Sequence, residues 1–583
     1  MGRIVGIGNQ DFEVVRANDY FYIDKTRFIQ EWWESGDSVT LIARPRRFGK
    51  TLNMSMVENF FSVRCSGRSD LFEGLDVWEY ERFRKLQGTY PVLFISFADV
   101  KETTYHQARK KICSIIQAIY NQYRFLLEGD LLSENEKQDF QRVSADMEDY
   151  MASSALKALS SYLFRYYGRR VIILLDEYDT PMQEAYVNGY WKKLVSFTRS
   201  MFNSTFKTNP YLERAIMTGI TRVSRESIFS DLNNLKAVTT TSVEYADCFG
   251  FTEGEVFAAL DEYGLSDQKQ VVKDWYDGFT FGDQTEIYNP SSILNYLDTK
   301  RLGAYWANSS SNRLAGKLIR EGGRELKASF GQLLQGEGIK TEIDEQIIYD
   351  QLDEDERAVW SLLVASGYLK VKSFKAYMTD YGEWKQEYEL EITNYEVRTM
   401  FRNIVRKWFA SMGSVYNDFV KALLAGDVDA MNDYMNQVTA LTFSYFDTGG
   451  SEREEPERFH CVEAITKRFK EQNASACFYH GFVLGLMVDL SGRYVLTSNR
   501  ESGFGRYDVM LEPLRPEDDG IILEFKVFRP QKEKSLEDTV EAALKQIEEK
   551  QYEAALTAKG FRGERIRKYG FAFQGKHVMI GSA

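Results

Sequence analysis

The stretch that decides the fold is Arg44-Pro45-Arg46-Arg47-Phe48-Gly49-Lys50-Thr51, which directly follows the apolar run 38–43. A strand that enters a tight glycine loop, followed by a helix with free N–H groups, is the arrangement that binds phosphate. In such loops the lysine neutralises the β- and γ-phosphates and the threonine hydroxyl binds Mg²⁺. The general pattern has glycine where this chain has Arg44, so the loop alone is weak support for a nucleotide site.

A second segment strengthens this interpretation. Residues 171–175 form an apolar run that ends in Asp176 and Glu177. In a nucleotide site we expect Asp176 to hold Mg²⁺ and Glu177 to polarise an attacking water. A further strand, 214–219, brings Thr218 to a position that senses the γ-phosphate, with Arg222 close by. ATP binding is predicted, whereas hydrolysis is left open. The predicted nucleotide contacts are Arg46, Arg47, Phe48, Gly49, Lys50, Thr51, Asp176, Thr218 and Arg222.

The pattern around these motifs predicts a parallel sheet with helices on both faces, because nearly continuous apolar strands alternate with helical segments. The expected strands are 38–43, 91–97, 171–175 and 214–219, and the expected helices are 52–61, 105–127 and 150–167. A strand between the loop and the Asp-Glu pair is typical of a sheet with an inserted strand. Residues 250–320 are predicted to be helical. A helix at 356–367 followed by strands at 368–371 and 388–392 indicates a winged helix, and 395–447 is predicted to be helical again.

A second set of polar residues lies near the other end of the chain. Asp508 follows Gly505-Arg506-Tyr507 and opens an apolar strand, and Glu524 and Lys526 follow the apolar run 521–523. Because side chains alternate along a strand, Glu524 and Lys526 leave on the same face, and a hairpin would bring Asp508 beside Glu524. Two carboxylates and a lysine are the metal ligands and base of a phosphodiester-cutting nuclease. The helix 536–552 carries Gln546 and Tyr552 toward the same cleft. The simpler alternative is an edge strand with alternating charge.

Composition narrows the class of protein. The chain has 583 residues, too many for one hydrophobic core, and a net charge of −13, which gives no general attraction to nucleic acid. Segment 559–576 has six basic residues and one acidic residue, and a nucleic-acid contact and an ordinary solvated face are equally good interpretations. We expect no membrane span and a cytoplasmic location, because long apolar runs are absent and the five cysteines are scattered. The four histidines are dispersed, so any metal is expected to be a hard cation, Mg²⁺ or alternatively Mn²⁺.

The chain resembles the bacterial and archaeal family that joins an AAA-type, P-loop ATPase-like domain to a C-terminal PD-(D/E)XK nuclease domain. The segments that carry this resemblance over nearly the whole length are 22–26, 44–51, 175–179, 219–222, 275–279, 288–290, 478–482 and 500–503, with Asp508, Glu524 and Lys526. The loop form with Arg44 is typical of this family. Relatives tend to carry a glutamate just before segment 478–482, where this chain has Ala474-Ser475-Ala476-Cys477.

The resemblance and the patterns together imply an α/β multidomain fold: a P-loop NTPase parallel sheet, a helical lid, a winged-helix-like middle and a C-terminal α/β restriction-endonuclease-like domain. The expected boundaries are 1–250 for the ATPase-like domain, 251–330 for the lid, 331–400 for the winged-helix-like module, 401–456 for a helical connector with a linker at 451–456, and 457–583 for the nuclease domain.

The function favoured by these residues is an ATP-binding, nucleotide-gated, Mg²⁺-dependent nuclease that cuts nucleic acid, with DNA favoured, in defence or DNA processing. Its expected catalytic residues are Asp508, Glu524, Lys526, Gln546 and Glu177, and its expected metal ligands are Asp508, Glu524, Thr51 and Asp176. One alternative is a non-catalytic ATP switch that binds nucleic acid or a protein partner through a degenerate nuclease domain. Another is an assembly ATPase acting on a protein. In a homo-oligomer, Arg222 or Arg225 would serve as an arginine finger.

Overall fold

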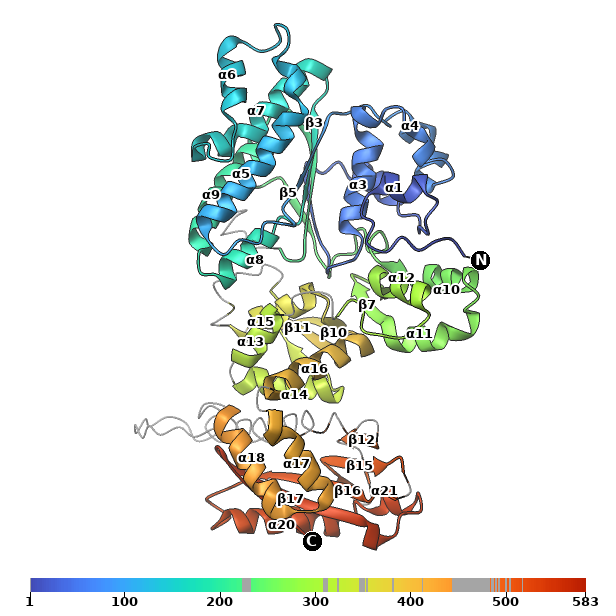
Figure 1. Ribbon diagram of the computed structural model, residues 1–583, viewed down its shortest axis with the longest axis vertical. Coiled ribbons are helices and arrows are strands. Elements are labelled where there is room, and N and C mark those ends of the chain that lie inside the picture. The colour runs from blue at the N-terminus through green and yellow to red at the C-terminus, as the bar shows by residue number, and fades with distance from the viewer. Residues whose placement is uncertain are drawn as a thin grey trace. The chain divides into compact units, whose positions relative to one another are not determined.

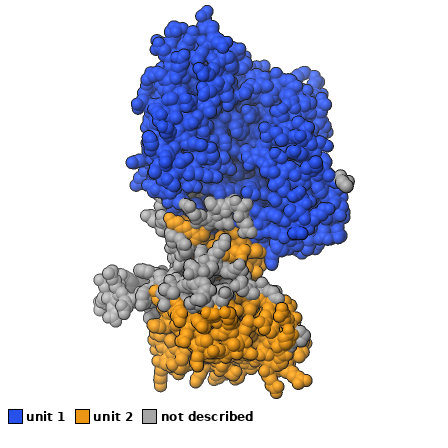
Figure 2. All heavy atoms as spheres, viewed as in Figure 1, with its two compact units in different colours: residues 1–314, 341–397 blue, residues 315–340, 398–583 orange. Residues whose placement is uncertain are grey.

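Two compact units make up the computed structural model, one of residues 1–314 and 341–397 and the other of residues 315–340 and 398–583 (Figure 2). The described positions are 2–222, 232–307, 313–321, 324–344, 352, 355–379, 382–410, 413–442, 483, 487, 490, 493–498, 501–502, 505–515 and 517–583. The predicted linker 451–456 and the segment 474–477 lie outside them, as do residues 443–447, at the end of the predicted helical segment 395–447, and Arg225.

The first unit is built on a five-stranded parallel sheet in the order β2-β3-β4-β1-β5. The strands are β2 (Val92–Ser96), β3 (Val171–Asp176), β4 (Leu212–Gly219), β1 (Val39–Ala43) and β5 (Leu235–Val238). Strand β4 is inserted between β1 and β3, so the phosphate-loop segment and the Asp-Glu pair leave the sheet on either side of it. The parallel sheet predicted from the sequence is confirmed. The edge strand β5 was not predicted, because it is short and three of its four residues are only half-buried.

Helices pack on both faces of this sheet, as expected for parallel strands (Figure 1). One group is α5 (Tyr105–Gln122), α6 (Glu134–Arg142), α7 (Asp149–Tyr167), α8 (Thr180–Val187) and α9 (Trp191–Phe202). The other is α1 (Phe12–Ala17), α2 (Arg27–Ser35), α3 (Lys50–Phe61) and α4 (Glu81–Arg84). The second group shares one apolar core with the sheet, in which Phe28 and Trp32 of α2 and Phe60 and Phe61 of α3 are fully buried.

Residues 251–299 are not entirely helical, so that part of the prediction is wrong. Helices α10 (Glu253–Glu262), α11 (Lys269–Tyr276) and α12 (Pro290–Thr299) are accompanied by a small sheet in the order β6-β8-β7. Its strands are β6 (Phe251–Thr252), β8 (Gln284–Tyr288) and β7 (Asp277–Phe281). In β7, Phe279 and Phe281 alternate with half-buried residues, and Gly278 takes φ 135°, so the chain follows the two-residue period of a strand.

The same unit continues through α15 (Glu356–Ala365) into the long hairpin of β10 (Leu369–Met378) and β11 (Trp384–Ile392). The predicted helix at 356–367 and the strands near 368–371 and 388–392 are confirmed, and both strands extend further toward the hairpin tip. Helix α16 (Tyr395–Ala410) then carries the chain from the first unit into the second, because the boundary falls between Val397 and Arg398.

A mixed five-stranded sheet in the order β12-β15-β16-β17-β18 forms the centre of the second unit. Its strands are β12 (Tyr494–Ser498), β15 (Val509–Pro513), β16 (Gly520–Val527), β17 (Ile566–Gln574) and β18 (His577–Ser582). Only β16 and β17 are parallel, and helix α20 (Leu536–Glu549) makes the crossover between them, followed by α21 (Ala554–Thr557). The other α-helices and strands of the described residues, in either unit or at the boundary between them, are α13 (Arg313–Glu321), α14 (Arg324–Gln335), β9 (Ile339–Thr341), α17 (Gly413–Ala425), α18 (Val428–Thr442), β13 (Glu501–Ser502) and β14 (Gly505–Arg506).

Helix α18 covers the edge of this sheet with amide side chains. Asn432 and Asn436 each donate to and accept from the backbone of one β18 residue, Ile580 and Val578, over 2.7–2.9 Å. The two side chains thereby replace the missing neighbour strand, which protects an edge that would otherwise pair with other chains. In the described part of the chain, no helix combines the length and the apolar character that a bilayer crossing requires.

Two glycines allow α20 to lie close to the sheet. A Cβ atom at Gly570 would lie 2.8 Å from the carbonyl oxygen of Val540, and one at Gly581 would lie 2.6 Å from the Val540 side chain. We predict that Gly570→Ala lowers the free energy of unfolding by about 1–3 kcal/mol, because α20 must shift away from β17. Urea denaturation measures the change. Gly563→Ala, where a Cβ has nothing within 4 Å, is the control and should change stability by less than about 0.5 kcal/mol. Equal effects of the two substitutions would contradict the prediction.

Candidate functional sites

The first site is the loop between β1 and α3. Its chain reversal places Arg47 at φ 62° and Gly49 at φ 79°, and α3 begins at Lys50. The Lys50 ammonium donates to the carbonyl oxygens of Arg44 and Pro45 at 2.9 Å each, which holds the loop closed around its own lysine. Burial lowers the pKa of Lys50. The geometry is therefore a strand, a left-handed glycine and a helix N-terminus, the arrangement that offers backbone N–H groups to phosphate.

Arg44 replaces the first glycine of the general pattern without entering the loop. Its side chain is fully buried; its guanidinium donates to the carbonyl oxygens of Thr239 and Glu244, and it lies 4.5 Å from the ring centroid of Phe281. Burial lowers its pKa to about 10. Phe48 is also buried, with its ring centroid 4.8 Å from Phe279 and 5.3 Å from Phe281. The buried side chains of Arg44 and Phe48 thus attach the loop segment to β7 and to the residues after β5.

Asp176 connects three elements of the nucleotide site. One carboxylate oxygen accepts from the Thr51 hydroxyl at 2.9 Å and the other accepts from the Thr218 hydroxyl. The side chain is fully buried, and burial raises its pKa. The structure therefore brings together three of the residues predicted from separate segments. An oxygen-rich pair of Thr51 and Asp176 fits the ligand preference of Mg²⁺.

Sequence reasoning gave no role to Asp179, although it lies in a segment that supports the family resemblance. Its carboxylate is buried and accepts from the backbone N–H groups of Ile220 and Thr221 and from the Thr221 hydroxyl, at 2.9 Å each. It thereby fixes the end of β4 beside Thr218. Glu177 lies next to this group at φ 49° and accepts from the Thr180 hydroxyl at 3.0 Å.

Arg222 lies just beyond β4, where it lines a small cavity with Ala43 and Thr239.

Residues of α8 and α12 contact the loop from outside the sheet. Arg46 donates to the Gln183 side chain of α8 at 3.1 Å, and its carbonyl accepts from Asn289 at 3.2 Å. Arg47 donates to the Ser291 hydroxyl at 3.3 Å. Asn289 also caps α12 by accepting from the N–H groups of Ser291 and Ser292. The N-terminus of α12 is therefore held directly against the nucleotide loop.

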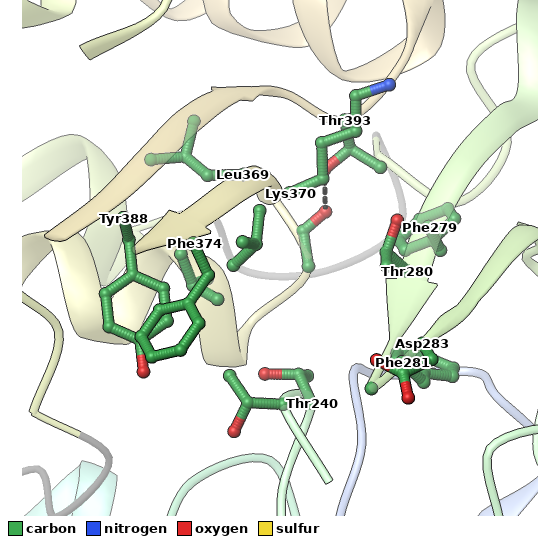
Figure 3. A pocket seen from close by; sticks show the side chains of 15 residues that line it. Thr240, Phe279, Thr280, Phe281, Asp283, Leu369, Lys370, Phe374, Tyr388 and Thr393 are labelled. Carbon is green, nitrogen blue, oxygen red and sulfur yellow. Dashed lines mark hydrogen bonds between the residues drawn. The ribbon is translucent and has the colours of Figure 1, made fainter. Parts of the chain in front are cut away.

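A cavity of about 250 Å³ lies behind the loop, on the side to which Phe48 and Arg44 point. One wall is Phe279 and Phe281 of β7, and the other is the Phe374–Tyr388 pair of the β10–β11 hairpin (Figure 3). None of the predicted nucleotide or nuclease residues lines this cavity, so it is separate from both candidate sites.

The second site lies on the central strands of the C-terminal sheet. Val509 of β15 pairs with Leu523 of β16, and the Asp508 carboxylate accepts from the backbone N–H of Phe525 at 2.7 Å. The predicted hairpin therefore brings Asp508 beside Glu524. On the opposite face of β16, Phe525 packs against Phe571 with ring centroids 5.2 Å apart. This packing fixes the strand, so Glu524 and Lys526 both face α20.

Gln546 of α20 connects the polar groups of this second site. Its amide nitrogen donates to Glu524 Oε1 and, at 3.0 Å, to the Tyr552 hydroxyl, while its amide oxygen accepts from Lys526 Nζ at 2.6 Å. One side chain thus orients the carboxylate and the lysine together. The predicted helix ends at Glu549, and Tyr552 follows it as a fully buried ring.

Two buried carboxylates give this second site its electrostatic character. Burial raises the pKa of Asp508 to about 6, and burial together with the charge of Asp508 raises the pKa of Glu524 to about 8. Glu524 Oε2 is buried and has no hydrogen-bond partner among the described residues. A buried acceptor without a partner is rare and calls for an ion or water. Asp508 and Glu524 therefore fit a hard cation that binds through oxygen.

The basic segment 559–576 is largely neutralised. Lys559 pairs with Glu512 at 2.5 Å, Lys568 pairs with Glu553 at 2.7 Å, and both Arg565 and Arg567 pair with Asp519. Of the two interpretations of this segment, the geometry favours a paired protein surface over a phosphate-binding patch.

Comparison with known proteins identifies two domains in this chain. Residues 6–229 match the model of a family described as "Predicted AAA-ATPase", and residues 477–583 match a model of the PD-(D/E)XK nuclease superfamily. The chain thus carries an AAA-ATPase-like domain near its N-terminus and a PD-(D/E)XK nuclease domain at its C-terminus, which confirms the resemblance. A protein of Azotobacter chroococcum mcd 1, described as an "uncharacterized protein in vnfD 5'region", is 26% identical over 320 residues, 54% of this chain and 56% of that protein. The chain therefore matches about half the length of this relative.

The raised carboxyl pKa values predict how stability depends on pH. The folded state binds a proton on Glu524 up to about pH 8, whereas the unfolded chain releases it near 4.5, so stability falls as pH rises between these values. In metal-free buffer, Glu524→Gln removes this penalty. The variant should gain at least about 1.4 kcal/mol on the wild type between about pH 5.5 and about pH 8.5. Denaturant titrations measure the difference, and a constant difference across this range would refute the prediction.

Proposed function

We propose that this protein is a metal-dependent nuclease that cuts nucleic acid, DNA in preference to RNA, and that ATP bound at the N-terminal loop governs the cutting. The observation that carries the proposal is the group of Asp508, Glu524 and Lys526 around Gln546, with one buried Glu524 oxygen left unpaired. The nuclease-family match over residues 477–583 supports it. Defence or DNA processing is the role that such an enzyme would serve.

The residues of the nuclease site have separate roles in this proposal. Asp508 and Glu524 would hold Mg²⁺ or Mn²⁺, which when bound supplies charge stabilisation and lowers the pKa of water. Asp508 is kept in place by the N–H of Phe525. The ammonium group of Lys526 would orient the attacking water. Gln546 is the positioning residue that aligns Lys526 with Glu524.

The N-terminal site is proposed to bind ATP with Mg²⁺. Lys50 and the loop N–H groups would contact the phosphates, and Thr51 and Asp176 would hold the cation. Thr218 would sense the γ-phosphate through the Asp176 carboxylate, which also accepts from Thr51. Glu177 is the proposed residue that polarises water, and Arg222 the proposed arginine finger in a homo-oligomer. Arg46 and Arg47 join the loop to α8 and α12.

The proposed architecture has an ATPase-like domain at 1–250, a lid at 251–330, a winged-helix-like module at 331–400, a helical connector at 401–456 and a nuclease domain at 457–583. Helices α10 to α12 support the lid, and α15 with the β10–β11 hairpin supports the winged-helix-like module.

A hydrogen-bonded path gives nucleotide control a physical basis. Asn289 joins the loop carbonyl of Arg46 to the first turn of α12. In that turn, the Ser292 hydroxyl donates to the buried carboxylate of Glu396 at 2.8 Å, which also accepts from the N–H of Trp306 at 2.6 Å. Glu396 lies in the first turn of α16, the helix that continues into the second unit. A change at the loop can thus be transmitted to α16 through α12.

A second candidate function is an ATP switch with an inactive nuclease domain. The sequence Ala474-Ser475-Ala476-Cys477, which has no carboxylate where relatives tend to carry a glutamate, favours it. The intact set of Asp508, Glu524 and Lys526 with its unpaired oxygen favours catalysis.

Cleavage assays test the proposal directly. Plasmid and short single- and double-stranded DNA and RNA are incubated with the full chain, with Mg²⁺ or Mn²⁺, and with or without ATP. We predict metal-dependent cutting that falls at least about 100-fold in Asp508→Asn and in Lys526→Ala, because both remove a group at the reacting phosphate. Lys50→Ala should cut without responding to ATP. Absence of cutting of every substrate would instead support the inactive switch.

The path through α12 generates a separate prediction. Ser292→Ala removes the hydroxyl that binds Glu396 but leaves Asn289, Ser291 and the loop unchanged. We expect it to bind ATP with wild-type affinity and to lose most of the difference in cleavage rate between the ATP and ATP-free reactions. Thr299→Ala, at the exposed end of the same helix, is the control and should respond like the wild type. A full ATP response in Ser292→Ala would show that the path does not carry the signal.

A further inference from the structure

The segment between β16 and α20, residues 528–535, is a basic loop next to the nuclease site. Arg529, Lys532 and Lys534 are all exposed. Within the described part of the chain, no carboxylate forms an ion pair with any of the three. The paired lysines and arginines of segment 559–576 differ in this respect.

The acidic groups near this basic loop are engaged with the backbone and brace it. Glu533 Oε2 accepts from the N–H of Arg529 and from the Thr539 hydroxyl, at 2.8 Å each. Asp538 Oδ2 accepts from the N–H groups of Lys534 and Ser535 at 2.8 and 3.2 Å. The loop is further closed by the N–H groups of Lys532 and Glu533, which donate to the Arg529 carbonyl at 2.9 Å. Because the carboxylates stabilise the loop, the three cationic side chains remain available to a ligand.

The position of the basic loop relates it to the cleavage site. Phe528 still belongs to the sheet, since its N–H donates to the Phe573 carbonyl at 2.9 Å. Arg529 follows Lys526 by three residues, which places their Cα atoms about 10 Å apart along an extended chain. That distance is about the rise of three nucleotides along the axis of a duplex. The basic loop thus begins directly after the strand that carries Glu524 and Lys526 and leads into α20, the helix that carries Gln546.

We propose that the basic loop binds the sugar–phosphate backbone of the nucleic-acid substrate beside the scissile position. The proposal rests on the proposed nuclease function and adds the surface that grips its substrate. Three exposed cations on a braced loop would neutralise phosphates without reading bases, so the contact is independent of sequence. Since the chain carries a net charge of −13, such a local site is needed to overcome the general repulsion of a polyanion.

Binding is tested in the full chain carrying Asp508→Asn, with EDTA, so that the substrate stays intact. Fluorescence anisotropy with labelled duplex and single-stranded DNA, and with RNA of the same sequence, is measured over a range of salt concentrations. The loop variant carries Arg529→Gln, Lys532→Gln and Lys534→Gln. The control variant carries Arg515→Gln, Lys545→Gln and Lys550→Gln, which removes equal charge from exposed positions of the same domain. Equal melting temperatures establish that both are folded.

We expect the loop variant to bind at least about tenfold more weakly at low salt, and the slope of log affinity against log salt to fall by about two to three. The control variant should keep its slope within about one phosphate contact. Equal loss of affinity in the two variants, or wild-type binding by the loop variant, would overturn the proposal. The binding assay reports on the basic loop, and the cleavage assay above reports on the nuclease function. Loop-dependent binding by a protein that cuts no substrate in the cleavage assay would support the basic loop and reject the nuclease function. Normal cutting and binding by the loop variant would do the reverse.

Discussion

Asp176 depends on hydroxyl groups from two other elements, and the nucleotide half of the molecule is arranged around that need. A carboxylate buried in a sheet is costly unless donors satisfy both oxygens. Thr51 at the start of α3 and Thr218 in β4 provide them, and both are in place only when β4 lies between β1 and β3. The strand order and the closure of the loop are therefore set by the same constraint, as is the proposed cation site. Asp179 repeats the principle by binding the N–H groups that follow β4.

In the nuclease domain, a buried carboxyl group receives a donor from a different kind of side chain. Gln546 is neutral, and its amide donates to the Glu524 carboxyl group and accepts from the Lys526 ammonium, so it links the two groups. The second Glu524 oxygen is left without a donor at the position that a cation would take. Because α20 packs closely on the sheet at Gly570 and Gly581, Gln546 lies near enough to contact Glu524 and Lys526. Fold and site are thus coupled through a few close backbone approaches.

Two basic segments of the nuclease domain differ in whether acidic side chains pair with them. Segment 559–576 has the strongest basic bias in the nuclease end of the sequence, but Glu512, Asp519 and Glu553 pair with four of its six lysines and arginines. Among the described residues, the smaller group at Arg529, Lys532 and Lys534 forms no ion pair, because Glu533 and Asp538 bind backbone N–H groups instead. A count of charges along the chain cannot distinguish these cases, since pairing depends on residues distant in sequence.

Local chemistry was determined by the sequence itself. Apolar runs that lead to the loop before Thr51, to Asp176 and to Thr218 predicted the strands of the first site, and the two-residue spacing of Glu524 and Lys526 placed both on one face of a strand. These predictions succeeded because side-chain alternation and strand ends are local properties. The helical prediction for 250–320 failed at β7, and β5 was missed, since an isolated short strand is stabilised by neighbours that no local pattern reveals. The placement of Arg44 away from the loop, the Ser292–Glu396 contact and the unpaired Glu524 oxygen were decided only by the tertiary structure. Each depends on which distant donor or ring reaches a buried charge, and that is settled when the elements pack.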